Sequence, residues 1–160
     1  VVAAVEIDPK RKGFGRARLR HIADGGAVAL KGFIESTVAV GATVRTDAWW
    51  GYTQDAVEGR KHSATTIKRS GRKAHEVLPA THRVFALLHR VMLGTYQGAV
   101  RPKHLDAYLA EFEFRFNRRH AKSRTLLFQR ALSCAVLTRA PEYWRIVGRP
   151  APRVRVVEAA

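Results

Sequence analysis

The sequence predicts an α/β domain built on a mixed sheet that is flanked by helices. Apolar, β-branched runs of strand length open the chain, and a helical pattern separates the second run from the third. This order of strand, strand, helix and strand requires a crossover connection, which is typical of a mixed sheet. The chain has 160 residues, of which 46% are hydrophobic and 26% are charged. That length and composition suffice for one domain with a buried core.

The first two predicted strands form a hairpin with one basic face. Residues 1–7 are apolar and β-branched, as in a buried strand, and a turn rich in Lys and Arg follows. Residues 14–22 alternate, which places Arg16, Arg18 and Arg20 on one face of the second strand. This row of arginines is either a plain solvated face or a surface that contacts phosphates.

The third predicted strand ends at an acidic residue. A helix over residues 27–38 is followed by Gly41, which suits a helix end, and then by a strand over residues 43–46. Asp47 comes directly after this strand. An acid at the carboxyl end of a strand is either a functional side chain of an α/β sheet or ordinary turn and capping chemistry. We retain Asp47 as a candidate catalytic residue.

A short helix and an edge strand are expected next. Residues 49–55 suit the helix, and residues 61–67 form a strand polar enough to lie at an edge. A basic loop follows, with cations at Lys68, Arg69, Arg72 and Lys73. The loop is either solvated or in contact with nucleic acid.

Three helices are predicted in the second half of the chain. They cover about residues 80–93, 103–118 and 125–137, and the first opens after Pro79. Their apolar stripes are core positions, and with those of the first helix they comprise Leu30, Phe33, Ile34, Val38, Val84, Leu87, Leu88, Val91, Leu105, Tyr108, Leu109, Phe112 and Phe116. Residues 140–160 are expected to form a poorly ordered tail with a short helix near 142–146.

The charge of the chain points to a polyanionic partner. Lys and Arg number 29 against 13 acids, so the net charge is +16. Nucleic acid is the first expectation, and no long basic amphipathic helix supports a membrane surface instead. The one cysteine, Cys134, excludes an internal disulfide, and no apolar run reaches the roughly 20 residues of a membrane span. We expect a cytoplasmic protein associated with the nucleoid.

Four segments of the sequence, taken together, resemble a known family. They are Val44 to Tyr52 (VRTDAWWGY), Leu78 to Phe85 (LPATHRVF), Leu93 to Gly98 (LGTYQG) and His104 to Arg119 (HLDAYLAEFEFRFNRR). In this combination and order they resemble the DDE-type transposase domain of bacterial insertion sequences of the ISXO type. The resemblance covers about residues 1–132, and residues 133–160 are expected to form a partly disordered C-terminal extension.

The resemblance implies a ribonuclease-H-like fold with a two-ion site for Mg²⁺ or Mn²⁺. In this superfamily three side chains converge on the metal ions. By motif match Asp47 is the second of them and His82 the third, a place that the family fills with Glu, Asn or His. The first Asp would stand on a strand upstream of Val1, so we expect an N-terminally truncated domain whose metal site is incomplete in this chain. Extra helices follow the sheet.

The implied reaction is cleavage of DNA strands and their transfer to a target, which moves an insertion sequence. The partners are DNA ends, target DNA and further copies of the protein. His89 stands where the family usually has Lys. The expected DNA-binding residues are Arg16, Arg18, Arg20, Lys68, Arg69, Arg72, Lys73, His89, Arg90, Arg115, Asn117, Arg118 and Arg119.

Three alternatives stay open at this point. The chain is either an active enzyme domain, a remnant that only binds DNA, or an unrelated basic RNA-binding protein. In the same way, Trp49 and Trp50 either stack on an unpaired base or pack against the protein.

Overall fold

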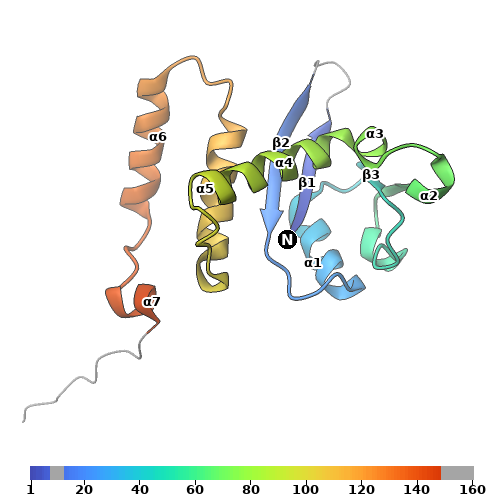
Figure 1. Cartoon of the computed structure of the whole chain (residues 1–160), viewed down its shortest axis with the longest axis horizontal. Helices are drawn as coiled ribbons and strands as arrows, with labels where there is room; N and C mark the ends of the chain where they lie inside the picture. Colours follow the sequence, from blue (N-terminus) through green and yellow to red (C-terminus); the bar gives the residue numbers. More distant parts are fainter. Residues whose placement is uncertain (8–12, 149–160) are drawn as a thin grey trace, which may run out of the picture. The chain divides into compact units, whose positions relative to one another are not determined.

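The structure, a computed structural model, describes residues 1–7 and 13–148 (Figure 1). Two compact units are formed, Val1–Arg119 and His120–Ala160. The strands are β1 (Val2–Ile7), β2 (Phe14–Arg20), β3 (Thr43–Thr46) and β4 (Lys61–Ala64). The helices are α1 (Ala27–Thr37), α2 (Ile67–Ser70), α3 (Ala74–Val77), α4 (Pro79–Gly94), α5 (Leu105–Asn117), α6 (Arg124–Leu137) and α7 (Tyr143–Val147), with short 3₁₀ turns at Asp55–Val57 and Pro102–His104. This mixture confirms the predicted α/β class.

β1 and β2 form the predicted antiparallel hairpin, with helices on both of its faces. Their register pairs Val2 with Arg20 and Val5 with Ala17. The side chains of Val2 and Ala4 pack with α1, whereas Ala3 and Val5 pack with α4 and α5. Cover on both faces is the environment of a strand inside a sheet rather than of an exposed hairpin.

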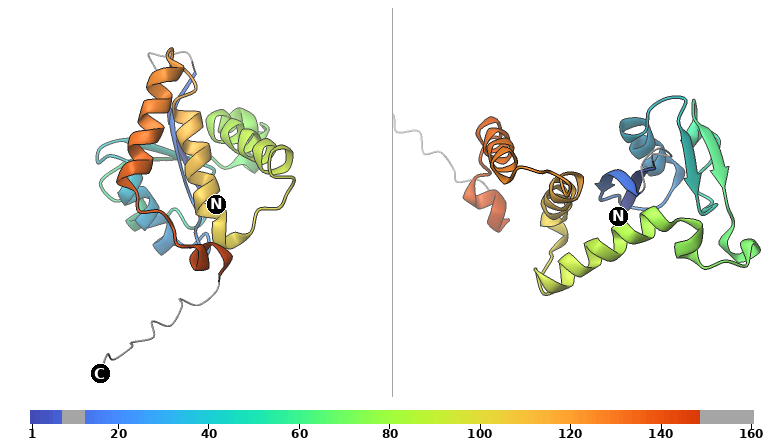
Figure 2. Two further views of the ribbon diagram at one scale, coloured as in Figure 1. Left: turned by 90° about the vertical axis from the view of Figure 1, so that its left-hand side faces the viewer. Right: turned by 90° about the horizontal axis from the view of Figure 1, so that it is seen from above.

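The strands do not join into the one mixed sheet that their order predicts. β3 and β4 pair in parallel from Thr43 with Lys61 to Thr46 with Ala64, and they form a second two-stranded sheet. Within the described residues no strand pairing links β3 to the hairpin. In Figure 1 and in the right-hand view of Figure 2, the β3–β4 pair lies on the β1 side of the hairpin and α5 lies on the β2 side.

The predicted apolar stripes supply two cores. One core joins β2 to α4 and α5 through Ala17, Leu19, Val84, Leu88, Leu109, Phe112 and Phe116. The other joins β1 to α1 and the turn at Asp55–Val57 through Val2, Leu30, Phe33, Ile34 and Val57. Helical spacing therefore identified the buried faces of α1, α4 and α5 correctly.

Side chains of α5 bond to the backbone along the outer edge of β2. Asn117 accepts from the Ala17 N–H at 2.7 Å and donates to the Ala17 carbonyl at 2.9 Å. Glu113 accepts from the Leu19 N–H, and Arg119 donates to the Gly15 carbonyl at 3.2 Å. The side chains of one helix thus replace the strand that would otherwise pair here.

Several local elements differ from the sequence prediction. Residues 49–54 form a turn instead of a short helix, and Gly51 in that turn lies so close to Gly25 and Leu30 that a Cβ would meet them. The first half of the expected basic loop belongs to α2, which ends at Gly71 with a φ of 64°, and α3 begins directly after the loop. The predicted tail beyond residue 148 lies outside the described residues, as does most of the turn between β1 and β2.

The second unit is described by α6 and α7 alone. Ser123 caps α6, since its hydroxyl accepts from the Leu126 N–H, but no residue of α6 is buried. The predicted domain boundary after residue 132 falls within this helix and stays a prediction. In the part of the chain that the structure describes, no helix has both the length and the apolar character needed to cross a bilayer.

Candidate active site

Asp47 lies at the carboxyl end of β3, where the sequence places it. Thr46, the last residue of the strand, is the buried polar residue of the core, and Asp47 is exposed immediately after it. Its Oδ1 accepts a hydrogen bond from the Trp49 N–H at 3.3 Å. This Asx turn uses one oxygen of the carboxylate. The strand therefore delivers an exposed carboxylate whose direction is set by the turn that follows.

The neighbours of Asp47 include two groups that sequence reasoning did not single out. Tyr52 is half-buried, and its pKa is raised by desolvation first and then by the negative charge of Asp47. His62 lies on β4, and its Nε2 is 2.9 Å from the Thr46 hydroxyl. The His62 ring also lies 6.3 Å from the Tyr52 ring, centroid to centroid. The parallel pairing of β3 with β4 is the signal that would have placed His62 here.

His82 lies in the first turn of α4 and lines a shallow pocket of about 380 Å³. The backbone N–H of His82 bonds to the Leu78 carbonyl at 3.1 Å, so the helix begins as the sequence predicts. The other lining residues are Phe14, His75, Pro79, Arg83 and Ala86. His89 and Arg90, also on α4, are exposed.

A hydrogen bond connects β3, the strand before Asp47, to the end of α3, the helix that precedes the helix of His82. The Arg45 guanidinium donates to the Val77 carbonyl at 3.4 Å. No contact of the described residues joins the Asp47 carboxylate to the His82 imidazole. Nor do those residues contain a group of three or more His, Cys, Asp or Glu placed to hold a metal ion.

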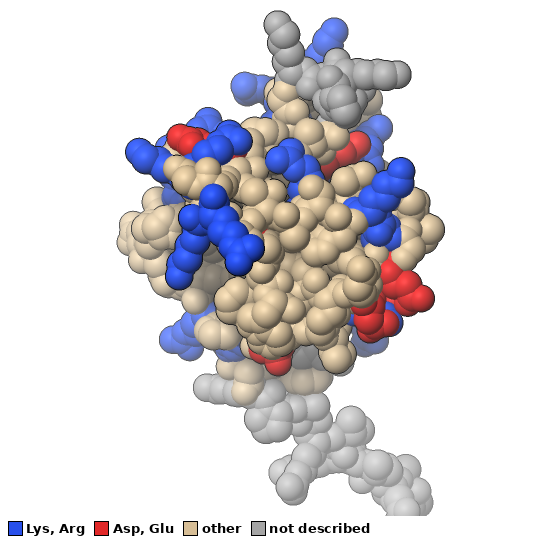
Figure 3. Space-filling view, turned by 90° about the vertical axis from the view of Figure 1, so that its right-hand side faces the viewer, with Lys and Arg blue, Asp and Glu red and all other residues tan. Residues whose placement is uncertain are grey.

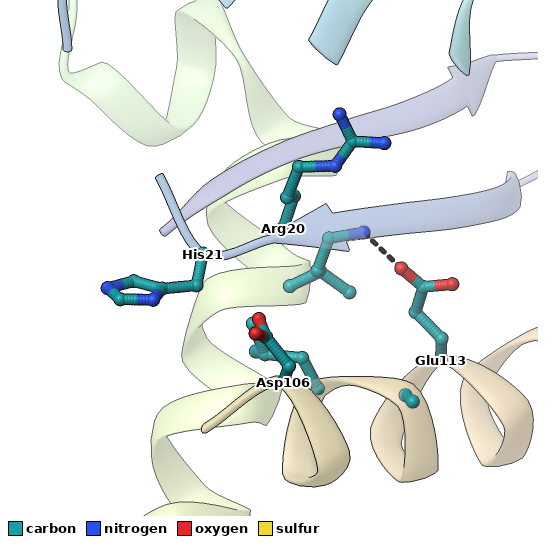
Figure 4. A pocket seen from close by; sticks show the side chains of 7 residues that line it. Arg20, His21, Asp106 and Glu113 are labelled. Carbon is teal, nitrogen blue, oxygen red and sulfur yellow. Dashed lines mark hydrogen bonds between the residues drawn. The ribbon is translucent and has the colours of Figure 1, made fainter. Parts of the chain in front are cut away.

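A second pocket, of about 490 Å³, lies between β2 and α5 (Figure 4). Glu113 directs one carboxylate oxygen at the Leu19 N–H. Asp106 lies about two turns earlier on α5, and His21 points away from both. None of the predicted catalytic residues lines it. Since Glu113 is committed to β2, this pocket serves the packing of α5 rather than the chemistry at Asp47.

The predicted DNA-binding residues divide by their contacts. On the hairpin, Arg18 pairs with Glu113 at 3.3 Å, and Arg20 bonds to the Ser36 hydroxyl at 3.0 Å. Arg16 is exposed on the same strand. Lys68, Arg69, Arg72 and Lys73 are exposed around α2, and Arg72 alone of these pairs with an acid among the described residues, Glu76.

The basic residues at the end of α5 are used within the protein. Arg115 pairs with Glu111 at 3.2 Å, and Asn117 bonds to β2 as described above. The guanidinium groups of Arg118 and Arg119 lie over Phe114 and Phe116, at 3.9 and 4.1 Å from the ring centroids. Figure 3 shows further Lys and Arg side chains in separate groups on one face of the molecule, with fewer acidic side chains among them.

Comparison with known proteins identifies the family. A family model described as the ISXO2-like transposase domain matches residues 1–117. No match was found among curated proteins or among solved structures. The matched residues include Asp47, His82 and all of α5, which lie in the segments that carried the resemblance in the sequence. The family match covers well over half of the chain, and the chain belongs to the ISXO2-like transposase domains.

Proposed function

We propose that this chain is the catalytic core of a DDE-type transposase and that Asp47 holds the divalent ions at which DNA strands are cleaved and transferred. The observation that carries the proposal is the exposed carboxylate of Asp47 at the end of β3. Phosphodiester cleavage develops negative charge on the attacking and leaving oxygens, and Mg²⁺ or Mn²⁺ ions about 4 Å apart stabilise both. Hard oxygen ligands such as this carboxylate suit either ion.

His82 is proposed as the second protein group of the site. The Arg45 to Val77 hydrogen bond supports this role, because it ties the strand that ends before Asp47 to the last residue of α3, two positions before α4 begins at Pro79. An imidazole is a softer ligand than a carboxylate and suits Mn²⁺ better than Mg²⁺. His82 would hold one ion weakly or orient a water or phosphate beside it.

The described residues supply too few oxygen ligands for two ions, so we propose that a further strand completes the site. The outer edge of β1 supports this proposal. The backbone N–H groups of Ala17 and Leu19 point away from β1, toward α5. The backbone N–H and C=O groups of their register partners Val5 and Ala3 therefore point outward on the opposite edge. No hydrogen bond between described residues reaches that edge. A ribonuclease-H-like sheet would place the first Asp on a strand paired there, between β1 and β3.

DNA is the partner of the family in general, and the exposed cations are the proposed contacts. Among the described residues, Arg16, the cations around α2 and Arg90 carry charge and pair with no acid, apart from Arg72, and His89 is exposed beside Arg90. Such contacts hold phosphates and do not read sequence. We propose that they fix the DNA ends over Asp47, and that the active complex contains more than one copy because two ends must be joined.

The first experiment tests the metal site by the stability of the whole chain. Mn²⁺ is expected to raise the melting temperature of the 160-residue chain, since an ion that binds only the folded state stabilises it. Asp47→Asn should abolish this rise. Asp106→Asn, which removes an exposed carboxylate from α5, is the matched control and should leave the rise intact. An unchanged Mn²⁺ response in Asp47→Asn would contradict the assignment of Asp47.

The second experiment measures DNA binding and cutting by the same chain. We expect duplex binding that weakens steeply with salt and little or no Mg²⁺-dependent nicking, because the first carboxylate is proposed to come from another strand. Strong nicking that Asp47→Ala abolishes would support Asp47 and show that the further strand is dispensable. Tighter binding of duplex RNA than of duplex DNA would favour the RNA-binding alternative.

A further inference from the structure

Two tryptophans are exposed in the turn that follows Asp47. The side chain of Trp49 is 50% exposed and that of Trp50 is 68% exposed. Their rings lie 5.8 Å apart, centroid to centroid, at an angle of 44°. An indole ring is among the largest apolar groups of any protein and normally contributes its area to a core or an interface. Exposure of both rings beside a candidate catalytic carboxylate therefore requires an explanation.

The contacts of the two rings are different. Trp49 is anchored, because its indole Nε1 donates to the Gly25 carbonyl at 3.0 Å. In the part of the chain that the structure describes, no hydrogen bond holds the ring of Trp50, and Trp49 is its one aromatic neighbour. Trp49 thus fixes the turn to the start of α1, whereas Trp50 presents its ring to solvent.

The turn holds Trp50 in one position. Ala48 has a φ of 61°, a left-handed conformation that costs free energy for any residue with a Cβ and persists only where its surroundings enforce it. Those surroundings are the Asx turn at Asp47 and the buried Gly51. A Cβ at Gly51 would meet the Gly25 carbonyl oxygen and would lie 2.8 Å from Leu30 Cδ1. The exposed ring is therefore presented by a rigid turn.

We propose that Trp50 is a stacking platform for an unpaired base of the DNA that Asp47 acts on. This proposal rests on the proposed function, since it takes DNA as the partner. The charge of +16 favours a polyanion over an apolar protein. Asp47 begins the turn and accepts from the Trp49 N–H, so its negative charge disfavours a phosphate beside the turn but does not disfavour a neutral base. Every base has a π-face, so the platform accepts any of the four.

The position of Trp50 gives the platform a use in the reaction. It stands three residues after Asp47 on the same rigid turn, so a base stacked on it lies near the strand end that carries the carboxylate. A base withdrawn from the duplex leaves its neighbouring phosphates free to turn toward the ions that this carboxylate is proposed to hold. Trp50 is thus a positioning residue that orients a strand and takes no part in bond breaking.

The test compares two DNAs of equal length, a fully paired duplex and a duplex with a one-nucleotide bulge. The full chain is expected to bind the bulged duplex about 5-fold or more tightly than the paired one, in line with measured base–aromatic stacking. Trp50→Ala should reduce this ratio to about one and leave the affinity for the paired duplex unchanged. Trp50→Phe, which keeps a smaller ring, should retain part of the ratio.

The control variant is Trp144→Phe, which keeps both tryptophans of the turn and should behave as the unaltered chain. When this variant binds, the fluorescence of a 2-aminopurine in the bulge should be quenched. Binding of Trp50→Ala should not quench this fluorescence. A bulge preference that survives Trp50→Ala, or no preference in the unaltered chain, would overturn the stacking proposal alone. Failure to bind either DNA would overturn the proposed function too. If Trp50→Ala lowers the melting temperature so far that the chain is not folded in the assay, the preference of Trp50→Phe for the bulged duplex decides between the outcomes.

Discussion

The two edges of the β1–β2 hairpin are treated in opposite ways. At the β2 edge, Glu113, Asn117 and Arg119 bond to the outward backbone groups of alternate residues. At the β1 edge, no hydrogen bond between described residues reaches the outward groups of Ala3 and Val5. One edge is closed by side chains of α5 and of Arg119 just after it, and the other has no backbone partner among the described residues.

The difference indicates where the sheet ends and where the proposed further strand would pair. Unpaired edges invite pairing with other chains, and proteins close the edges at which a sheet ends. The β2 edge has such a closure. The β1 edge has none, although β1 is packed on both faces like an interior strand. The short parallel pair β3–β4 is also unusual alone, since parallel strands normally lie inside larger sheets.

The largest expected effect comes from opening the closed edge. Asn117→Ala removes both bonds to Ala17 and leaves a partly buried N–H and C=O without partners. We expect a loss of about 2–6 kcal/mol in the free energy of unfolding, at about 1–3 kcal/mol for each of the two unpaired groups. Urea titration measures it. Gln129→Ala, on the exposed surface of α6, is the control and should change stability by less than about 0.5 kcal/mol.

An intermediate effect is expected from proline substitutions on β1. The backbone N–H of Ala4 points toward β2 and bonds within the hairpin, whereas the backbone N–H of Ala3 points to the opposite edge of β1. Proline removes an N–H, so Ala4→Pro loses a bond that Ala3→Pro does not lose. Ala4→Pro should therefore be less stable than Ala3→Pro by about 1 kcal/mol or more, again by urea titration. Equal losses in the two variants would mean that the β1 edge is not open.

The smallest effects are expected from two arginine variants, one at the closed β2 edge and one at a proposed DNA contact. Arg119→Ala removes bonds to β2 and should cost stability of about 1–2 kcal/mol. Arg69→Ala, on the exposed α2, should leave stability unchanged and reduce the slope of log affinity against log salt by about one. If Arg119→Ala reduced the slope of log affinity against log salt more than Arg69→Ala did, Arg119 would be a DNA contact after all.

The sequence predicted the elements better than their connections. Periods of two and 3.6 residues located the hairpin and the buried faces of α1, α4 and α5, because these periods follow from local geometry. They did not show that the strands form two separate pairs. Strand pairing depends on backbone groups that no side-chain period records, so the expected mixed sheet was not found among the described residues.

The candidate site shows the same division. Asp47 after β3 and His82 in the first turn of α4 were located from the sequence, and the family match supports the motif that contains them. The sequence did not predict that His62 lies beside the end of β3, because its contact with the Thr46 hydroxyl depends on the parallel pairing of β3 and β4. The predicted metal and DNA-binding roles stay predictions that the experiments above address.

By itself the sequence determined the class of fold, the basic charge, the stripes of the helices and the family to which residues 1–117 belong. Only the tertiary structure decided what the polar side chains at the end of α5 do. Arg115, Arg118 and Arg119 form with Asn117 a polar, mostly basic run that is typical of DNA contact, yet Asn117 and Arg119 bond to β2 about a hundred positions earlier. A basic residue has the same charge in either role, and only its neighbours in space distinguish a protein contact from a phosphate contact.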